Sequence, residues 1–271
     1  MYHTCLGVNG RLTVRLDASF LSIQIVNDCF ASGLHSSNDA FRLRLCYLLY
    51  RFLKECRTDI PPDMCATIAN SFRDLLLIVP KLPDPEEVET DMLTDAVKDA
   101  TFDSQLYLYE TIGILCSIMF KSPQEESELL MSFVQPLMDD LSSSLTAYSQ
   151  NSQDALHVVK TRHIIMALGN VAKGFPDYPQ PPVPEGYILP PVNVFGEIGQ
   201  AILVCLQAMN VYRVVRDAVS TLRDIAHSNH ILTFRRLALL LHESWPQLAR
   251  LSLISSPHSC LICLSTLILQ S

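Results

Sequence analysis

Apolar residues recur every three or four positions along most of the chain, which is the spacing of a helix that buries one face. In residues 39–57, the side chains of Phe41, Leu45, Leu48 and Phe52 all fall on one such face. The same pattern, interrupted by prolines and by acidic segments, predicts further helices. They span residues 17–35, 63–79, 102–120, 124–150, 153–173, 194–210, 212–227 and 231–245.

One kind of helix recurs and alternates with a more variable kind. It has an arginine near its start, as at Arg44, Arg162 and Arg216, and continues with small and apolar residues on one face. A looser fourth copy has Gly113 in the place that Gly169 takes. Small residues there would let the paired helix approach closely. Tandem helix pairs predict an all-α fold, a HEAT-repeat superhelical solenoid of antiparallel helix pairs.

Two linkers are expected to interrupt this solenoid, which we place at residues 17–251. Residues 82–99 should form an acidic, solvated loop, because acidic side chains crowd this segment. Residues 175–192 should form a proline-rich loop, since no helix persists at that density of proline. The N-terminal segment 1–16, which holds the hairpin-type dipeptide Asn9–Gly10, and the apolar tail 252–271 stay unassigned.

The composition narrows the class of protein. Only nine of the 271 residues are glycine, which argues against α/β enzymes with their glycine-rich turns and phosphate loops. Nine cysteines, an odd number, lie mostly in apolar runs, so we expect buried free thiols in a reducing compartment. Leu261–Leu269, the nearest approach to a membrane span, is too short, and no membrane contact is expected.

The sequence predicts no catalytic residue, metal site or cofactor. His157 and His163 lie on different faces of one predicted helix, and Cys260 and Cys263 form a single pair that is weak evidence for zinc. No phosphate-loop motif occurs. A flexible acidic loop lacks the rigid, low-dielectric setting that tunes a general acid. These observations favour a binding protein over an enzyme.

Basic side chains gather on one face of the predicted helix 39–57. Arg44, Arg51 and Lys54 are separated by seven and three positions, and Tyr47 lies between them. Arginine suits phosphate, and tyrosine can stack on a base or ribose, so these four residues are candidates for RNA binding. In the alternative interpretation, Arg44 pairs with an acid of the adjacent repeat and the others form a solvated face.

A second basic stripe lies on the predicted helix 212–227, where Arg213, Arg216 and Arg223 are further RNA-binding candidates. Asp217 and Asp224 interrupt it, which favours pairing of arginine with aspartate between repeats. Weaker basic pairs lie at residues 160 and 162 and at residues 235 and 236. The net charge of −8 means that RNA could be bound only by such local stripes on an acidic body.

Three segments carry a resemblance to a known family. They are "AFRLRLCYLLYRFLK" at Ala40–Lys54, "DSQLYLYETIGIL" at Asp103–Leu115 and "FVQPLMDDLSSSL" at Phe133–Leu145. The chain is similar in these segments to the exportin-T family, which are β-karyopherins. The similarity is close over residues 38–145 and looser over residues 154–236.

The resemblance implies a HEAT-repeat carrier that exports tRNA from nucleus to cytoplasm with GTP-bound Ran. It implies tRNA, Ran and nuclear pore proteins as partners, and shuttling between nucleus and cytoplasm. The chain should correspond to part of the C-terminal half, with the main Ran contacts expected in N-terminal repeats outside it. The alternative is a HEAT-repeat scaffold or protein-cargo transport adaptor without RNA binding, because solenoids serve many functions.

Overall fold

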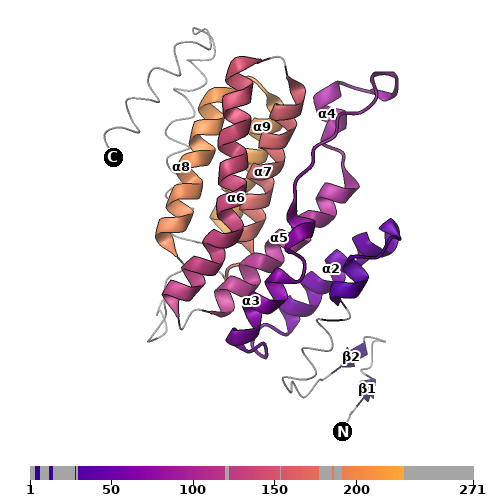
Figure 1. The fold of residues 1–271 in the computed structure, drawn as a ribbon, viewed down its shortest axis with the longest axis vertical. Helices are drawn as coiled ribbons and strands as arrows, with labels where there is room; N and C mark the ends of the chain where they lie inside the picture. Colours follow the sequence, from indigo (N-terminus) through magenta and orange to yellow (C-terminus); the bar gives the residue numbers. More distant parts are fainter. Residues whose placement is uncertain are drawn as a thin grey trace.

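The computed structural model describes residues 4–6, 12–14, 28, 30–119, 122–152, 154–176, 185 and 191–228. Helices make up most of this part of the chain (Figure 1). The α-helices are α2 (Asp39–Glu55), α3 (Pro62–Asn70), α4 (Met92–Ala96), α5 (Ala100–Ile118), α6 (Pro123–Gln150), α7 (Ala155–Lys173), α8 (Val192–Met209) and α9 (Arg213–Ser228). Two short 3-10 helices, η1 (Arg73–Leu76) and η2 (Pro85–Glu87), lie between α3 and α4.

Most of the predicted helices are confirmed to within a few residues. The helix predicted over 63–79 is wrong in its second half, because α3 ends at Asn70 and η1 follows. The chain turns there so that the side chains of Gln105 and Tyr109 can bind carbonyl groups of residues 75–77. Of the helix predicted over 17–35 only the end is described, as helical residues 30–34, and the one predicted over 231–245 lies outside the described residues.

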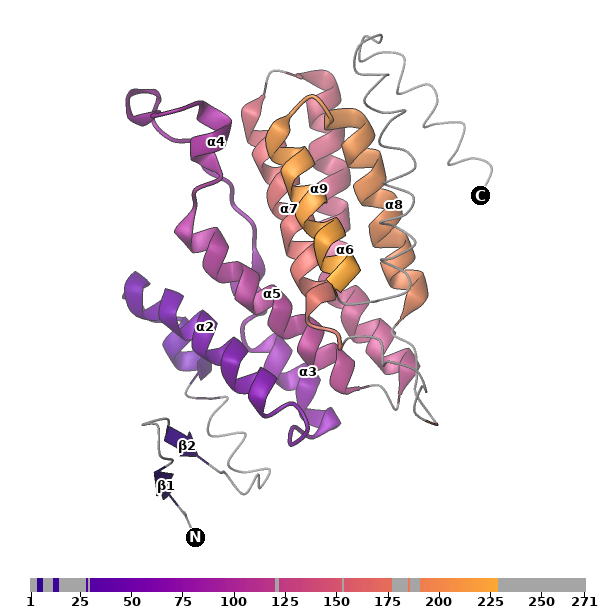
Figure 2. The same cartoon turned by 180° about the vertical axis from the view of Figure 1, so that it is seen from behind.

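The helices form two layers, as an α-solenoid requires. Helices α2, α5, α7 and α9 lie side by side in chain order, and these are the four that the sequence marks as one recurring kind. Helices α3, α6 and α8 pack on them, so that α3 pairs with α5, α6 with α7 and α8 with α9 (Figures 1 and 2). The axes of α2 and α5 are inclined to those of α6 to α9. The all-α solenoid prediction is thus confirmed.

Helix α5 lies at the centre of this arrangement. It contacts α2, α3, α6 and α7, and every residue from 108 to 118 is buried. A helix that is covered on all sides needs little amphipathic pattern, which explains why the apolar face of this segment was the least distinct in the sequence. Helix α5 contacts helices of its own layer and of the other layer, so its few polar side chains can meet charged groups from either layer.

Glycines let the recurring helices touch one another closely. A Cβ atom at Gly113 of α5 would overlap the carbonyl oxygen of Val171 at the end of α7, and would lie 2.9 Å from the Cα atom of Gly174. A Cβ atom at Gly169 of α7 would lie 3.0 Å from Cδ1 of Leu222 on α9. The small residues therefore face the next helix of the same layer. The expectation that they face the paired helix was wrong.

The acidic segment 82–99 contains more regular structure than a solvated loop. It includes η2 and α4, and its aspartates bind backbone N–H groups. Asp91 caps α4, and Asp99 caps α5 by accepting hydrogen bonds from the backbone of Thr101 and Phe102. Asp95 accepts hydrogen bonds from residues 89 and 90 and pairs with Lys98 at 2.7 Å, and these contacts lower the pKa of its carboxyl group. The proline-rich loop lies almost wholly outside the described residues.

Two three-residue strands precede the helices. β1 (Thr4–Leu6) pairs antiparallel with β2 (Leu12–Val14), with Thr4 opposite Val14. They flank the Asn9–Gly10 dipeptide, which itself lies outside the described residues. Five cysteines are described, all as free thiols, and all but the partly buried Cys56 are buried. Among the described helices, none is both long and apolar enough to cross a membrane.

Candidate nucleic-acid interface

Helix α2 carries the first predicted stripe along the side that borders α5. The Asn38 side chain caps the helix by accepting a hydrogen bond from the Phe41 N–H, and this cap fixes the start of α2 at Asp39. Arg44 and Arg51 are exposed, and Tyr47 is partly buried. The guanidinium of Arg44 lies over the Tyr47 ring, 5.1 Å from its centroid. The stripe is therefore a set of cations along one helix with an aromatic ring between them.

The contacts of Arg44 differ from the alternative interpretation, in which Arg44 pairs with an acid of the adjacent repeat. Within the described part of the chain, Arg44 makes no ion pair. Lys54 makes the contact between helices, with its Nζ atom 3.7 Å from Oε1 of Glu110 on α5. Arg51 pairs within its own helix, with Glu55 at 3.0 Å. Among the described residues, the ring of Tyr47 is thus the one polar or ring contact found for the Arg44 guanidinium.

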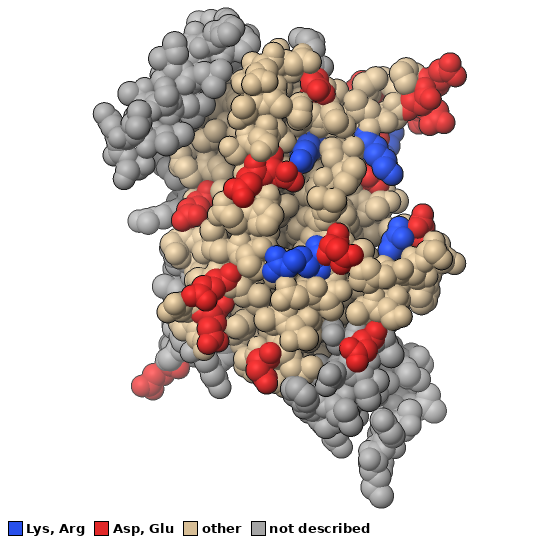
Figure 3. Space-filling view, viewed as in Figure 1, with Lys and Arg blue, Asp and Glu red and all other residues tan. Residues whose placement is uncertain are grey.

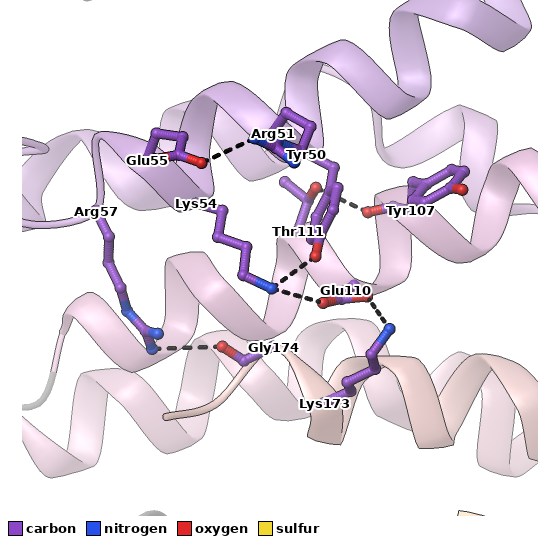
Figure 4. A network of polar contacts seen from close by, with 10 residues as sticks. All are labelled: Tyr50, Arg51, Lys54, Glu55, Arg57, Tyr107, Glu110, Thr111, Lys173 and Gly174. Carbon is purple, nitrogen blue, oxygen red and sulfur yellow. Dashed lines mark hydrogen bonds and ion pairs between the residues drawn. The ribbon is translucent and has the colours of Figure 1, made fainter. Parts of the chain in front are cut away.

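A network of charges lies where α2, α5 and α7 meet (Figure 4). Its centre is the carboxylate of Glu110, whose side chain is only 3% exposed. Lys173, at the end of α7, donates a hydrogen bond to Oε2 of Glu110 at 2.9 Å. Lys54 also donates to the Tyr50 hydroxyl at 2.7 Å, and this hydrogen bond is the main cause of the raised pKa of Lys54. Two helices thereby place ammonium groups around one buried anion.

Arg57 closes the same junction from the residues that follow α2. Its guanidinium donates to the hydroxyl of Ser117 near the end of α5 and to the carbonyl of Gly174, the latter at 3.3 Å. A cation at helix C-terminal ends is favourable, because the last carbonyl groups of a helix have no partner within it. Arg57 is partly buried, and burial lowers its pKa. Its role is to join α2 to the ends of the next two helices of the layer.

Three tyrosines lie together beside these charges. The ring centroid of Tyr107 on α5 lies 5.3 Å from that of Tyr47 and 5.5 Å from that of Tyr50. Tyr107 is 36% exposed, so part of its ring faces solvent. Tyr107 and Lys173 were not predicted as site residues from the sequence. Lys173 could have been found as a basic residue in the last turn of a recurring helix, whereas no local signal indicates Tyr107.

The described residues of the second predicted stripe make their polar contacts within α9 and with the end of α8. Arg213 pairs with Asp217 one turn along the same helix, at 3.3 Å, and its side chain is 83% exposed. Arg216 donates to the carbonyl groups of Asn210 and Val211, which end α8. The expected pairing of arginine with aspartate between repeats is wrong for Arg213. The side chain of Arg223 lies outside the described residues.

Both residues of the weaker basic pair, 160 and 162, contact other residues of the protein. Lys160 pairs with Asp140 of α6 at 2.9 Å. The guanidinium of Arg162 lies 5.7 Å from the centroid of the Phe102 ring, and burial lowers its pKa. His163 stacks on the same ring at 3.8 Å, and burial lowers its pKa to about 4, which keeps the imidazole neutral at physiological pH. Residues 235 and 236 lie outside the described part.

Charges of both signs alternate on the face of the molecule seen in Figure 1. Figure 3 shows lysine and arginine atoms there as separate groups, each next to aspartate or glutamate atoms, with no continuous basic band. In the part of the chain that the structure describes, no three histidine, cysteine, aspartate or glutamate side chains come together as a metal site would need. The open Arg44 and the lysines around Glu110 are therefore the strongest anion-binding candidates.

Comparison with known proteins gives one family. The sequence pattern of the Exportin-T family matches residues 11–235. Exportin-T of Laccaria bicolor is 54% identical over 205 residues, covering 76% of this chain and 19% of the relative. Exportin-T of Coprinopsis cinerea is 53% identical over 186 residues, covering 69% and 18%. Exportin-T of Neurospora crassa is 34% identical over 217 residues, covering 76% and 21%. The chain spans about a fifth of the length of these relatives.

Proposed function

The chain belongs to the exportin-T family, and from this premise we propose that it is a tRNA-binding segment of a nuclear export carrier. The observation that carries the proposal is the environment of Arg44 on α2. Arg44 is exposed, lies over Tyr47 and makes no ion pair within the described residues. An exposed guanidinium next to an aromatic ring suits contacts with a phosphate and with a base or ribose, which supports the proposal.

Several weak contacts suit a long, folded RNA better than one strong site does. Arg44, Arg51 and Lys54 follow one helix, and Lys173 continues the line of cations across α5 to α7. Each phosphate neutralised adds an increment of affinity that falls with salt. The net charge of −8 opposes the approach of RNA, so this segment should contribute to a binding surface larger than itself.

We also propose GTP-bound Ran and nuclear pore proteins as partners, because an export carrier would need both. GTP-bound Ran would bind together with tRNA, with its main contacts in repeats outside this chain. Nuclear pore proteins would contact the carrier during passage, and the protein would shuttle between nucleus and cytoplasm. The chain would act by binding and release, without catalysing a reaction.

A protein-cargo adaptor without RNA affinity is the second candidate. It is supported by the mixed charges in Figure 3 and by the acidic net charge, neither of which favours a polyanion. Both functions would use the same solenoid, because repeat proteins present extended surfaces to very different ligands. The two differ in whether the basic residues of α2 are used.

A titration of labelled tRNA with the 271-residue chain separates these functions. We expect weak binding at about 50 mM salt that is largely lost at about 200 mM. Absence of tRNA binding at low salt would contradict the carrier proposal and leave the adaptor.

A further inference from the structure

Two lysines from different helices share one buried carboxylate at the junction of α2, α5 and α7. Lys54 Nζ lies 3.7 Å from Oε1 of Glu110, and Lys173 Nζ lies 2.9 Å from Oε2 (Figure 4). The lysine side chains are 54% and 44% exposed, whereas the Glu110 side chain is 3% exposed. The ammonium groups therefore face both the buried anion and the solvent.

The charges of this cluster do not cancel. Two ammonium groups against one carboxylate leave one positive charge, and the exposed side of the cluster is the lysine side. Because both ammonium groups contact the oxygens of one small group, they are close enough to contact the oxygens of one small anion placed over it. Without Glu110 the two ammonium groups would repel each other and separate.

We propose that Lys54 and Lys173 together bind one backbone phosphate of tRNA over the buried carboxylate of Glu110. The inference rests on the proposed function and adds to it a cation on α7 and a defined phosphate position. A lysine ammonium is a compact point charge that suits a phosphate oxygen. The exposed edge of Tyr107 and the Arg44 and Arg51 side chains on α2 extend the same surface, so neighbouring parts of the RNA also find partners.

Glu110 has two effects in this proposal. It is a positioning residue that keeps the two ammonium groups together in the unbound protein. It also competes with the phosphate for the same donors, which weakens binding and favours release of the RNA. Arg57 lies at the same junction, but it is partly buried and its guanidinium is bonded to Ser117 and to the Gly174 carbonyl, so the phosphate is assigned to the two lysines.

The test is the salt dependence of tRNA binding by the 271-residue chain from about 50 to about 200 mM salt. The double variant K54Q/K173Q should lower the slope of log affinity against log salt by roughly 0.7–0.9, the value for one phosphate contact. Each single variant should lower it by no more than that. The matched control is K160Q, a lysine on the same helix as Lys173 whose partner is Asp140 of α6, and its slope should equal that of the wild type.

Two results would overturn the shared phosphate. An unchanged slope in K54Q/K173Q would mean that neither lysine contacts the RNA. A loss of about twice the single-contact value would mean that the lysines bind two separate phosphates. If the wild-type chain fails to bind tRNA at all, the proposed function fails. If R44Q/R51Q weakens binding and the double lysine variant does not, only the present inference fails.

The variant E110Q tests the second role of the carboxylate. Removing the competing charge should raise tRNA affinity by roughly three- to tenfold, the effect of one unit charge about 5 Å from a phosphate at a dielectric constant close to that of water. A melting curve confirms that the variant is folded. The loss of two ion pairs should lower the melting temperature in either case, so the tRNA affinity is the deciding measurement. Binding no tighter than that of the wild type would overturn the role of Glu110 as a competitor.

Discussion

Two of the three junctions within the layer of recurring helices are built on the same plan and differ in chemistry. At the junction of α5 and α7, Gly113 meets the backbone of Val171 and Gly174. At the junction of α7 and α9, Gly169 meets the side chain of Leu222. The first junction also carries the ions around Glu110, whereas the second is lined by apolar residues such as Ala218 and Leu222.

The difference shows that a repeated sequence position need not have a repeated function. Small residues recur because neighbouring helices of the layer must approach closely. Only at the first junction does the backbone itself leave no room for a side chain. The same close approach brings Lys54, Glu110 and Lys173 together, although Glu110 and Lys173 are 63 positions apart in the sequence. The tight junction is therefore also the place where surface chemistry can be built from three helices.

The largest effect is expected for G113A. Alanine normally stabilises a helix interior by about 1 kcal/mol relative to glycine. Here the added methyl group would overlap the Val171 carbonyl oxygen, which can move only with the backbone, so we expect a net loss of about 3 kcal/mol in the free energy of unfolding. Urea denaturation measures it.

The matched control is G169A, whose methyl group would meet only the flexible end of Leu222 at 3.0 Å. Its free energy of unfolding should change by less than about 1 kcal/mol in either direction. Equal losses in the two variants would remove the distinction between the junctions.

Glu126 is a second buried glutamate, and it differs from Glu110 in having no cationic partner among the described residues. Glu126 lies in the first turn of α6. Burial raises its pKa from 4.5 to about 7. The folded state therefore binds more protons than the unfolded state between these values, so Glu126 lowers stability as the pH rises from 4.5 to 7.

The variant E126Q should thus gain stability over the wild type with rising pH. The difference should be absent below pH 4.5 and reach about 3 kcal/mol at most above pH 7. His163, with its pKa lowered to about 4, acts in the opposite direction in both proteins and cancels in the difference. Thermal melting across this pH range measures it, and a constant difference would mean that Glu126 is not held neutral by burial.

A smaller loss is expected for E110Q, which breaks two ion pairs of a buried carboxylate. The lysine partners are about half exposed and can be solvated, so the loss should be about 1–2 kcal/mol in the free energy of unfolding. The control E55Q removes the exposed partner of Arg51 and should cost less than about 0.5 kcal/mol. A loss in E110Q as small as in E55Q would mean that the junction does not depend on its ions.

The smallest effect is expected for R213A on α9. Its partner Asp217 lies one turn along the same exposed helix face, and such pairs contribute less than about 0.5 kcal/mol. Chemical denaturation of R213A should be indistinguishable from that of the wild type. A loss above about 1 kcal/mol would indicate that the second junction depends on charge as well.

Local pattern was enough to predict most of the helices and to mark four of them as one recurring kind, because helical periodicity is a property of neighbouring residues. That these four lie side by side in one layer was not predicted. The positions of the α2 cations were predicted from local pattern. The partner of Lys54 was not, since it depends on how helices far apart in sequence cross. Arg216 was misjudged for a related reason: its partners are carbonyl groups at the end of the preceding helix, which no side-chain pattern reveals. The capping aspartates Asp91 and Asp99 could have been foreseen from capping preferences, but their acidic surroundings suggested a solvated loop.

We expect the cations of α2 to contact tRNA, and Arg213 of α9, which pairs with Asp217 on its own helix, not to contact it. The most direct test compares the salt dependence of tRNA binding for R44Q/R51Q and for R213Q in the 271-residue chain. We expect R44Q/R51Q to lower the slope of log affinity against log salt by roughly 0.7–0.9 for each lost contact, and R213Q to leave the slope unchanged. An unchanged slope in R44Q/R51Q, or an equal loss in R213Q, would contradict this expectation.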